Sequence, residues 1–232
     1  MKTKYNTEFW SLREPCRRVR YADWDEGMDY EGIVCPANDG HQRAGKRTTD
    51  LRIVLPGGHV EDFVWFQYGG ECLIQDKVLQ IFQKNDVTGF EVKPVQARFE
   101  KGSVSPPVLW EPIITGWAGV ASPESGIVLD KENSCPVCGH LHYTEVTDYS
   151  KLINPGQWDG SDIFMVWPLP RFVFVSGRLR QIIESANLIG CSCYEPKNLP
   201  IGRFHSGFSP GRLSYYMPEK RARELGEAIG IF

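Results

Sequence analysis

The hydrophobic positions of the chain follow two different spacings. Short β-rich runs at 51–56 and 62–67 flank a glycine-containing turn, which is typical of two strands. In the sequence DKVLQIFQ, the apolar residues are at helical spacing, which predicts a helix with Asp76 as its N-cap. The sequence GFEVKPV then predicts another strand. Residues 35–50 are polar and contain glycine, so they predict a loop.

This helix–turn–strand pattern occurs a second time later in the chain. In both VLQIFQKNDVTGFEV and LRQIIESANLIGCSCY, an amphipathic helix is followed by a polar turn, an apolar residue, a glycine and a strand. Equivalent positions, such as Gly89 and Gly190, lie 101 residues apart, and Ser176 stands where it can cap the second helix. Either an internal duplication produced two related α/β lobes, or short units of this kind recur by chance.

The short strands and few short helices predict an α+β fold with mixed or antiparallel sheets. We expect a single compact domain over residues 1–232. If the repeat is a duplication, this domain divides into two lobes, at about 1–105 and 106–200, around a zinc-knuckle-like loop. Residues 209–232 end in a charged, helix-forming pattern, and we expect a C-terminal helical tail there.

Composition and charge narrow the class of protein. Hydrophobic residues make up 41% of the 232 residues and charged residues 24%, which is an ordinary globular balance. The net charge of -3 argues against a nucleic-acid-binding protein, because such proteins usually carry a basic excess. No apolar run reaches the roughly 20 residues of a membrane-spanning helix, and the N-terminus lacks the apolar region of a signal peptide. We therefore expect a cytoplasmic protein without a membrane partner.

Cysteine usage points to metal chemistry. Seven cysteines in a chain without an export signal favour free thiols and metal ligands over a disulfide framework. The sequence SCPVCGHLHY contains one CxxC pair, Cys135 and Cys138, and the glycine after it allows both thiolates to face one ion. A tetrahedral zinc site needs four ligands, and the chain has no second CxxC. The sequence CPANDG resembles half of such a motif and offers Cys35 and Asp39.

These residues form a predicted structural zinc site made of Cys35, Asp39, Cys135 and Cys138. A neighbouring histidine could replace Asp39 as the fourth ligand. The other alternative is that the site has decayed and its cysteines are free or buried thiols. The candidate histidines are His41, His140 and His142.

A catalytic interpretation of the same cysteines is weaker. The sequence GGHVEDF places His59 and Glu61 in an H-x-E arrangement, which together with CxxC matches part of the zinc deaminase signature. That signature has proline directly before the first cysteine, whereas Ser134 stands there. The H-x-E also lies between predicted strands rather than at the start of a helix. We therefore expect no catalytic residues.

The order of these segments resembles a known family, the bacterial polymorphic-toxin immunity proteins with two CXXCG motifs. The resemblance covers most of residues 30–195 and is carried by IVCPANDGHQR, DKVLQIFQKNDVTGFEVKPVQARFE, SCPVCGHLHY and SDIFMVWPLPRFVFVSGRLRQIIESANLIGC. It implies zinc ligands at Cys35, Cys135 and Cys138, while the missing second cysteine of the first motif leaves Asp39 as a candidate replacement. It also implies a protein that is not an enzyme and that binds a toxin encoded by a neighbouring gene.

An inhibitor of this kind needs aromatic anchors and, against a basic toxin, acidic groups that speed association. A segment near the N-terminus offers both, so we expect it to contact the toxin. Two alternatives stay open: a zinc-ribbon-bearing adaptor or nucleic-acid-associated module, and an unrecognised enzyme. The expected contact residues are Asp23, Trp24, Asp25, Glu26, Asp29 and Tyr30.

Overall fold

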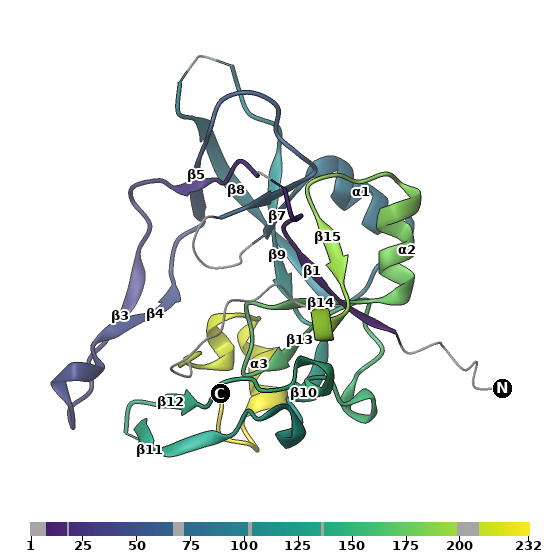
Figure 1. Cartoon of the computed structure of the whole chain (residues 1–232). Helices are drawn as coiled ribbons and strands as arrows, with labels where there is room; N and C mark the ends of the chain where they lie inside the picture. The colour runs from purple at the N-terminus through teal and green to yellow at the C-terminus, as the bar shows by residue number, and fades with distance from the viewer. Residues whose placement is uncertain (1–7, 18, 67–71, 102–103, 136, 199–208) are drawn as a thin grey trace.

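The computed structural model of the chain describes residues 8–17, 19–66, 72–101, 104–135, 137–198 and 209–232 (Figure 1). Strands dominate these residues, and the α-helices are short. The strands form two larger sheets and two separate hairpins, with both parallel and antiparallel pairs. The predicted α+β class with mixed sheets is therefore confirmed. Among these residues, no helix has the length and apolar character that crossing a membrane requires.

The first sheet joins the N-terminal strand to strands from the second half of the chain. Its order is β10 (Trp117–Val120), β13 (Ile163–Trp167), β14 (Val173–Ser176), β1 (Phe9–Arg13) and β15 (Ser192–Tyr194). β1 runs antiparallel to both of its neighbours, whereas β10 and β13 are parallel. β13 is apolar and buried along its whole length, as expected for a strand covered on both faces.

The second sheet comes from the first half of the chain. Its order is β2 (Asp23–Trp24), β5 (Leu51–Leu55), β8 (Phe90–Phe99), β9 (Leu109–Ile114), β7 (Cys72–Gln75) and β6 (Phe63–Trp65). The two strands predicted in the stretch from 51 to 67 are β5 and β6. They do not pair with each other, because β5 pairs in parallel with β8 and β6 pairs with β7.

Two hairpins stand apart from these sheets. The first, named the arm (residues 30–47), consists of β3 (Tyr30–Ile33) and β4 (Arg43–Arg47), with the 3-10 helix η1 (Asp39–His41) in its turn. The second hairpin consists of β11 (Leu129–Cys135) and β12 (His140–Tyr143). In Figure 1 the arm extends away from the six-stranded sheet, and its tip reaches down toward β11 and β12.

The helix–turn–strand pattern found in the sequence is present twice. α1 (Asp76–Lys84) follows β7 and α2 (Gly177–Ser185) follows β14, so both helix boundaries are shifted by 101 residues. The turns after the helices also match, with Asp86 and Asn187 at φ 49° and 50° and Gly89 and Gly190 at φ 91° and 93°. A Cβ at either glycine would collide with a backbone carbonyl oxygen of the other unit, so both positions require glycine.

The two units hold each other through equivalent hydrogen bonds. Asp62, directly before β6, accepts a bond from the backbone N–H of Ile189 at 2.9 Å. Asp162, directly before β13, accepts one from the backbone N–H of Thr88 at 3.1 Å. Thr88 and Ile189 are again 101 residues apart. Each unit therefore donates a backbone N–H to an aspartate of the other unit and accepts the equivalent bond in return. Two copies related by a two-fold axis make contacts in this way.

Basic side chains complete both contacts at matching positions. Lys77 of α1 pairs with Asp62 at 3.1 Å, and Arg178 of α2 pairs with Asp162 at 2.5 Å. Both carboxylates are buried, and a buried carboxylate is costly unless it is paired and hydrogen-bonded. We propose that the two units arose by internal duplication. The division of the domain into lobes at about 1–105 and 106–200 stays a prediction.

The larger of two hydrophobic core clusters in the described residues lies between the units. It includes Phe63 and Phe82 from the first unit and Phe164 and Phe174 from the second, all of them almost fully buried. Four further 3-10 helices lie in the connections, at η2 (Pro123–Ser125), η3 (Tyr149–Lys151), η4 (Pro155–Gln157) and η5 (Pro196–Asn198).

The C-terminal segment packs on the same core. It contains η6 (Leu213–Tyr215) and α3 (Glu219–Gly226), with Pro218 directly before the helix. The backbone N–H of Leu213 donates to the carbonyl of Ile231 at 2.8 Å, and both side chains are buried. The segment contributes buried side chains to the core, among them Met217 and Ala222.

Candidate metal centre

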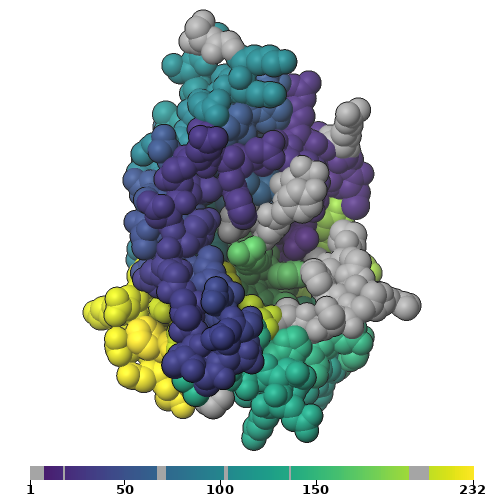
Figure 2. All heavy atoms as spheres, turned by 90° about the vertical axis from the view of Figure 1, so that its left-hand side faces the viewer, coloured from purple at the N-terminus to yellow at the C-terminus, as the bar shows by residue number. Residues whose placement is uncertain are grey.

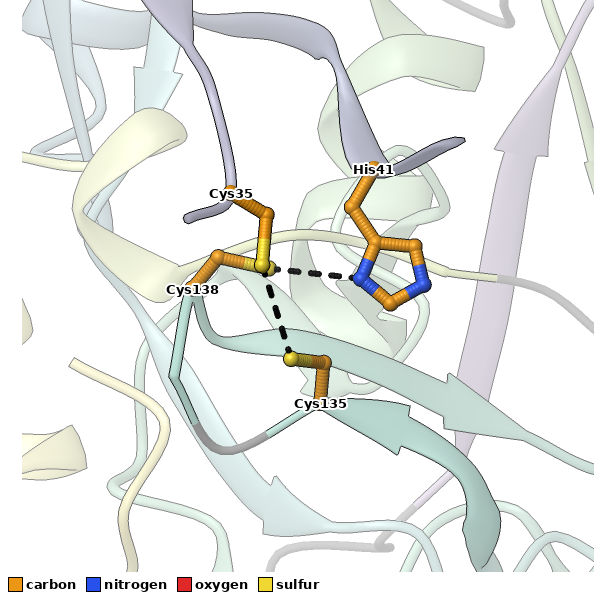
Figure 3. Close-up of side chains that lie close together, drawn as sticks. All are labelled: Cys35, His41, Cys135 and Cys138. Atoms are coloured by element: carbon orange, nitrogen blue, oxygen red, sulfur yellow. Dashed lines mark hydrogen bonds between the residues drawn. The ribbon is translucent and has the colours of Figure 1, made fainter. Parts of the chain in front are cut away.

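Four metal-ligand side chains meet where the arm reaches the second hairpin (Figure 3). Cys35 and His41 come from the turn of the arm, Cys135 ends β11, and Cys138 lies just before β12. Their ligand atoms all lie within 4.8 Å of one another. Because Cys35 and Cys135 are 100 residues apart, the cluster exists only in the folded chain.

Local sequence features shape both loops. In the arm, Asn38 caps η1, since its side-chain oxygen accepts a hydrogen bond from the N–H of Gly40 at 2.9 Å. This cap fixes the turn that carries His41. In the second hairpin, Gly139 has φ 65°, a left-handed conformation that glycine adopts at little cost. The chain can therefore reverse immediately after Cys138.

The separations in the cluster fit a tetrahedral metal ion. The Sγ atoms of Cys35 and Cys135 are 3.8 Å apart, and the Sγ of Cys138 lies 3.7 Å from Nδ1 of His41. Zinc bonds of about 2.3 Å to sulfur and about 2.0 Å to nitrogen give ligand–ligand edges of roughly 3.5–3.8 Å. Three cysteines and one histidine are also a ligand set of structural zinc sites. The residues present therefore fit zinc.

A cationic side chain stabilises negative charge in the cluster. Arg43 of β4 donates hydrogen bonds to the Sγ of Cys138 at 3.5 Å and to its carbonyl oxygen at 2.9 Å. Burial raises the pKa of the Cys138 thiol, but bonds from Arg43 and from the His140 backbone outweigh it and lower the pKa to about 6. Burial raises the pKa of Cys35. Without metal, Cys138 is therefore the thiolate of this pair near neutral pH.

The other two histidines lie next to the cluster without joining it. The ring of His140 stacks on that of His41, with centroids 4.8 Å apart and planes at 18°. Burial lowers the pKa of His140, which favours its neutral form. The hydroxyl of Ser209 lies 3.3 Å from Nε2 of His140 and 3.1 Å from Nδ1 of His142. Both rings therefore have partners outside the four-residue cluster.

The fourth member of the cluster differs from the predicted ligand. The sequence pattern placed Asp39 with the three cysteines, whereas the cluster contains His41 instead. Both residues belong to η1, but a 3-10 helix has three residues per turn, so side chains two positions apart point in different directions. Asp39 is exposed, while His41 faces the thiols. The three cysteines lie together, as expected.

The residues that match the deaminase signature do not come together in one site. Glu61 pairs with Arg17 at 2.6 Å. Within the part of the chain that the structure describes, neither His59 nor Glu61 belongs to the metal-ligand cluster. The H-x-E and CxxC motifs therefore do not combine into one site.

The expected toxin-contact residues lie along β2 and at the start of the arm. Trp24 and Tyr30 are 47% and 41% exposed, which is high for large aromatic side chains. Asp23, Glu26 and Asp29 are exposed as well. These five residues form what we name the acidic–aromatic surface.

Asp25 differs from these neighbours. Both of its carboxylate oxygens accept hydrogen bonds from the guanidinium of Arg98, at 2.7 Å each. These bonds hold the pKa of Asp25 down at about 2. Its charge is therefore neutralised within the chain, by a residue of β8 that the local sequence does not reveal.

A cleft of about 730 Å³ lies beside the arm. Figure 2 shows the arm, in blue and purple, running down the surface next to this hollow. Its lining includes Trp24 and Tyr30, the whole of β4, and Tyr215 from the C-terminal segment. Because Arg43 of β4 also contacts Cys138, the acidic–aromatic surface and the metal-ligand cluster border the same cleft.

The fold and the cluster define a strand-rich α+β domain in which protein side chains supply a full tetrahedral ligand set. A family model described as an immunity protein family (Imm11) matches residues 20–198. This match covers more than half of the chain, including both repeated units and both hairpins, so the chain belongs to the Imm11 immunity protein family. The expected membership among immunity proteins is thus confirmed, while the double-CXXCG pattern stays untested. No curated protein matches the chain.

Proposed function

We propose that the protein protects a bacterial cell by binding a cognate toxin and blocking its active surface. Membership in the immunity protein family carries this proposal. The protein acts as a stoichiometric binding partner rather than as an enzyme. It acts in the cytoplasm of the cell that makes the toxin.

The acidic–aromatic surface is the proposed contact region. Trp24 and Tyr30 provide large, partly exposed rings of the kind that anchor protein interfaces. The exposed carboxylates of Asp23, Glu26 and Asp29 would attract a basic toxin and speed the encounter. Asp25 has a structural role instead, because its charge is already paired.

We further propose that the cluster of Cys35, His41, Cys135 and Cys138 binds zinc. Catalytic zinc sites keep one coordination position open for water or substrate, whereas four protein ligands would fill all positions here. The role is therefore structural. When bound, zinc supplies a rigid link between the arm and the second hairpin.

The test uses the toxin encoded beside the gene of this protein. Co-expression with the immunity protein is expected to remove the growth defect that the toxin causes, and the purified proteins are expected to form a complex. Trp24→Ala is expected to weaken binding by about 2 kcal/mol, or roughly 30-fold, because it removes an aromatic anchor. Titration calorimetry measures this change, and unfolding by urea confirms that the variant is folded.

Charge reversal tests the carboxylates separately. A variant carrying Asp23→Lys and Glu26→Lys is expected to associate more slowly, with a difference that shrinks as salt is added. Glu132→Lys, which reverses an exposed charge on β11 outside the acidic–aromatic surface, is the control. No binding by the wild type would contradict the proposed function. Equal association rates for both reversals would contradict only the assigned surface.

A further inference from the structure

The strand β4 presents its edge to the cleft. All five of its residues, Arg43–Arg47, line the cleft. Successive side chains of a strand point to opposite faces, so a strand lying face-on would line a cleft with alternate residues only. Lining by all five consecutive residues is what a strand that turns its edge toward the cleft would give. Ala44 and Gly45 lie within it, and their small size adds little bulk beside the backbone of this edge.

The cleft-facing edge of β4 has no partner strand in the described residues. β4 pairs with β3 on one side, and this two-stranded sheet contains no other strand. Unpaired N–H and C=O groups along a strand edge are a template for the addition of another strand. An extended peptide laid along β4 would thus turn the arm into a three-stranded sheet.

The charges around this edge determine whether a bound peptide would be acidic or basic. Lys46, Lys93 and Arg171 line the cleft, and within the described parts of the chain their side chains have no hydrogen bond or ion pair. The acidic residues of the lining are fewer. Glu111 is already bound to an arginine of β4, which leaves Glu91 as the acidic side chain there without a described partner. The excess of unpaired positive charge favours an anionic segment.

We propose that the cleft binds an extended acidic segment of the cognate toxin as an added strand on β4. Backbone hydrogen bonds along β4 hold the segment in register, and its carboxylates reach Lys46, Lys93 and Arg171. Trp24 and Tyr215, which also line the cleft, provide aromatic contacts. This inference rests on the proposed function and specifies the feature of the toxin that is recognised.

The metal-ligand cluster helps to hold this edge in place. An isolated two-stranded hairpin is at best marginally stable in water. The tip of the arm is joined to the second hairpin through Cys35 and His41, and its base is held by the ion pair of Arg47 with Glu111. If the tip came free of the second hairpin, the β4 edge would become ordered only when the toxin binds. The free energy spent on that ordering would lower the affinity. Toxin binding is therefore expected to weaken when a chelator removes the metal.

Charge-reversal variants test the cleft with the toxin encoded by the neighbouring gene as the probe. Lys46→Glu and Arg171→Glu are each expected to lower the affinity about tenfold, measured by titration calorimetry. Lys84→Glu is the matched control, because it reverses an exposed lysine of α1 outside the cleft. Circular dichroism and metal content establish that the variants remain folded.

Hydrogen exchange tests strand addition independently of charge. The backbone amides of β4 are expected to gain protection in the complex, and overlapping peptides of the toxin should place the bound segment in an acidic stretch. Cleft variants that bind as tightly as the control, or a β4 edge that gains no protection, would overturn the inference while toxin binding stands. Protection of β4 without toxin, rising with protein concentration, would mean that a second copy occupies the edge, and would also overturn it. If the wild type binds no toxin, the proposed function itself fails and this inference fails with it.

Discussion

The two repeated units and the two hairpins both join distant parts of the chain, but they do so differently. The units share a buried core, and each supplies a backbone N–H to a buried carboxylate of the other. The arm and the second hairpin meet at their tips through the four cluster side chains, the stacked rings of His41 and His140, and the hydrogen bonds from Arg43 to Cys138. Thiols are weak hydrogen-bonding groups, so three cysteines and a histidine stabilise a junction poorly without an ion. The chain alone can thus hold the units together, whereas we expect a bound ion to stabilise the hairpin junction.

Loss of one buried carboxylate is expected to have the largest effect on the units. Asp162 accepts hydrogen bonds from Thr88 and Ser176 and pairs with Arg178. Asp162→Ala would leave these donors without an acceptor, so the free energy of unfolding is expected to fall by about 3 kcal/mol. Because the contacts are exchanged, Asp62→Ala is expected to have a similar effect. Urea unfolding measures both.

A surface pair on α2 provides the control for this prediction. Glu184 pairs with Arg180 at i,i+4, and its side chain is more than half exposed. Glu184→Ala is expected to change the free energy of unfolding by about 0.5 kcal/mol or less. If Asp162→Ala costs no more than this control, the reciprocal contacts do not hold the units together.

A smaller effect is expected from pH on the metal-free hairpin junction. The pKa of Cys138 is lowered from 9.0 to about 6 in the folded chain, so the unfolded chain binds more protons between these values. Stability in the presence of a chelator is therefore expected to rise as pH increases from 6 toward 9, and this contribution is lost as pH falls through 6. Burial lowers the pKa of His140 from its ordinary value of 6.5, so His140 also contributes to the loss of stability as the pH falls.

A comparison with Cys138→Ser separates the contribution of Cys138 to the pH dependence from that of His140. The variant keeps His140 but lacks the thiol, so the difference between its pH profile and that of the wild type reports Cys138 alone. Urea unfolding at several pH values, with chelator present, measures both profiles. Identical profiles would contradict the stabilisation of the Cys138 thiolate by Arg43.

Local sequence patterns predicted the repeated units well. Both helices lie where the apolar spacing placed them, and Ser176 caps α2 by accepting a hydrogen bond from the N–H of Leu179. The corresponding prediction for α1 was wrong by one residue, because Gln75 is the N-cap, and its side chain makes no capping hydrogen bond. Asp76 instead accepts a bond from the indole of Trp110 at 3.0 Å. Trp110, which is 34 residues away in the sequence, therefore binds the carboxylate that the local pattern had assigned to the N-cap.

The sequence revealed less about the arm and the contacts between units. β4 lies in a stretch predicted to be a loop, because the polar sequence RAGKR lacks the apolar alternation of a half-buried strand. The choice of His41 over Asp39 depends on the direction of side chains in a single helical turn. The exchanged carboxylates were missed, although an aspartate directly precedes both β6 and β13, in EDFVWF and SDIFMVW. That repeated aspartate is the signal that could have found them.

Metal content of the purified protein tests the hairpin junction most directly. We expect one zinc per chain, retained in Asp39→Ala and lost in His41→Ala and in Cys138→Ser. Loss of zinc should also lower the midpoint of thermal unfolding, because a ligand that binds only the folded state stabilises it. A wild-type protein without metal would contradict the account, and so would zinc that survives His41→Ala but not Asp39→Ala.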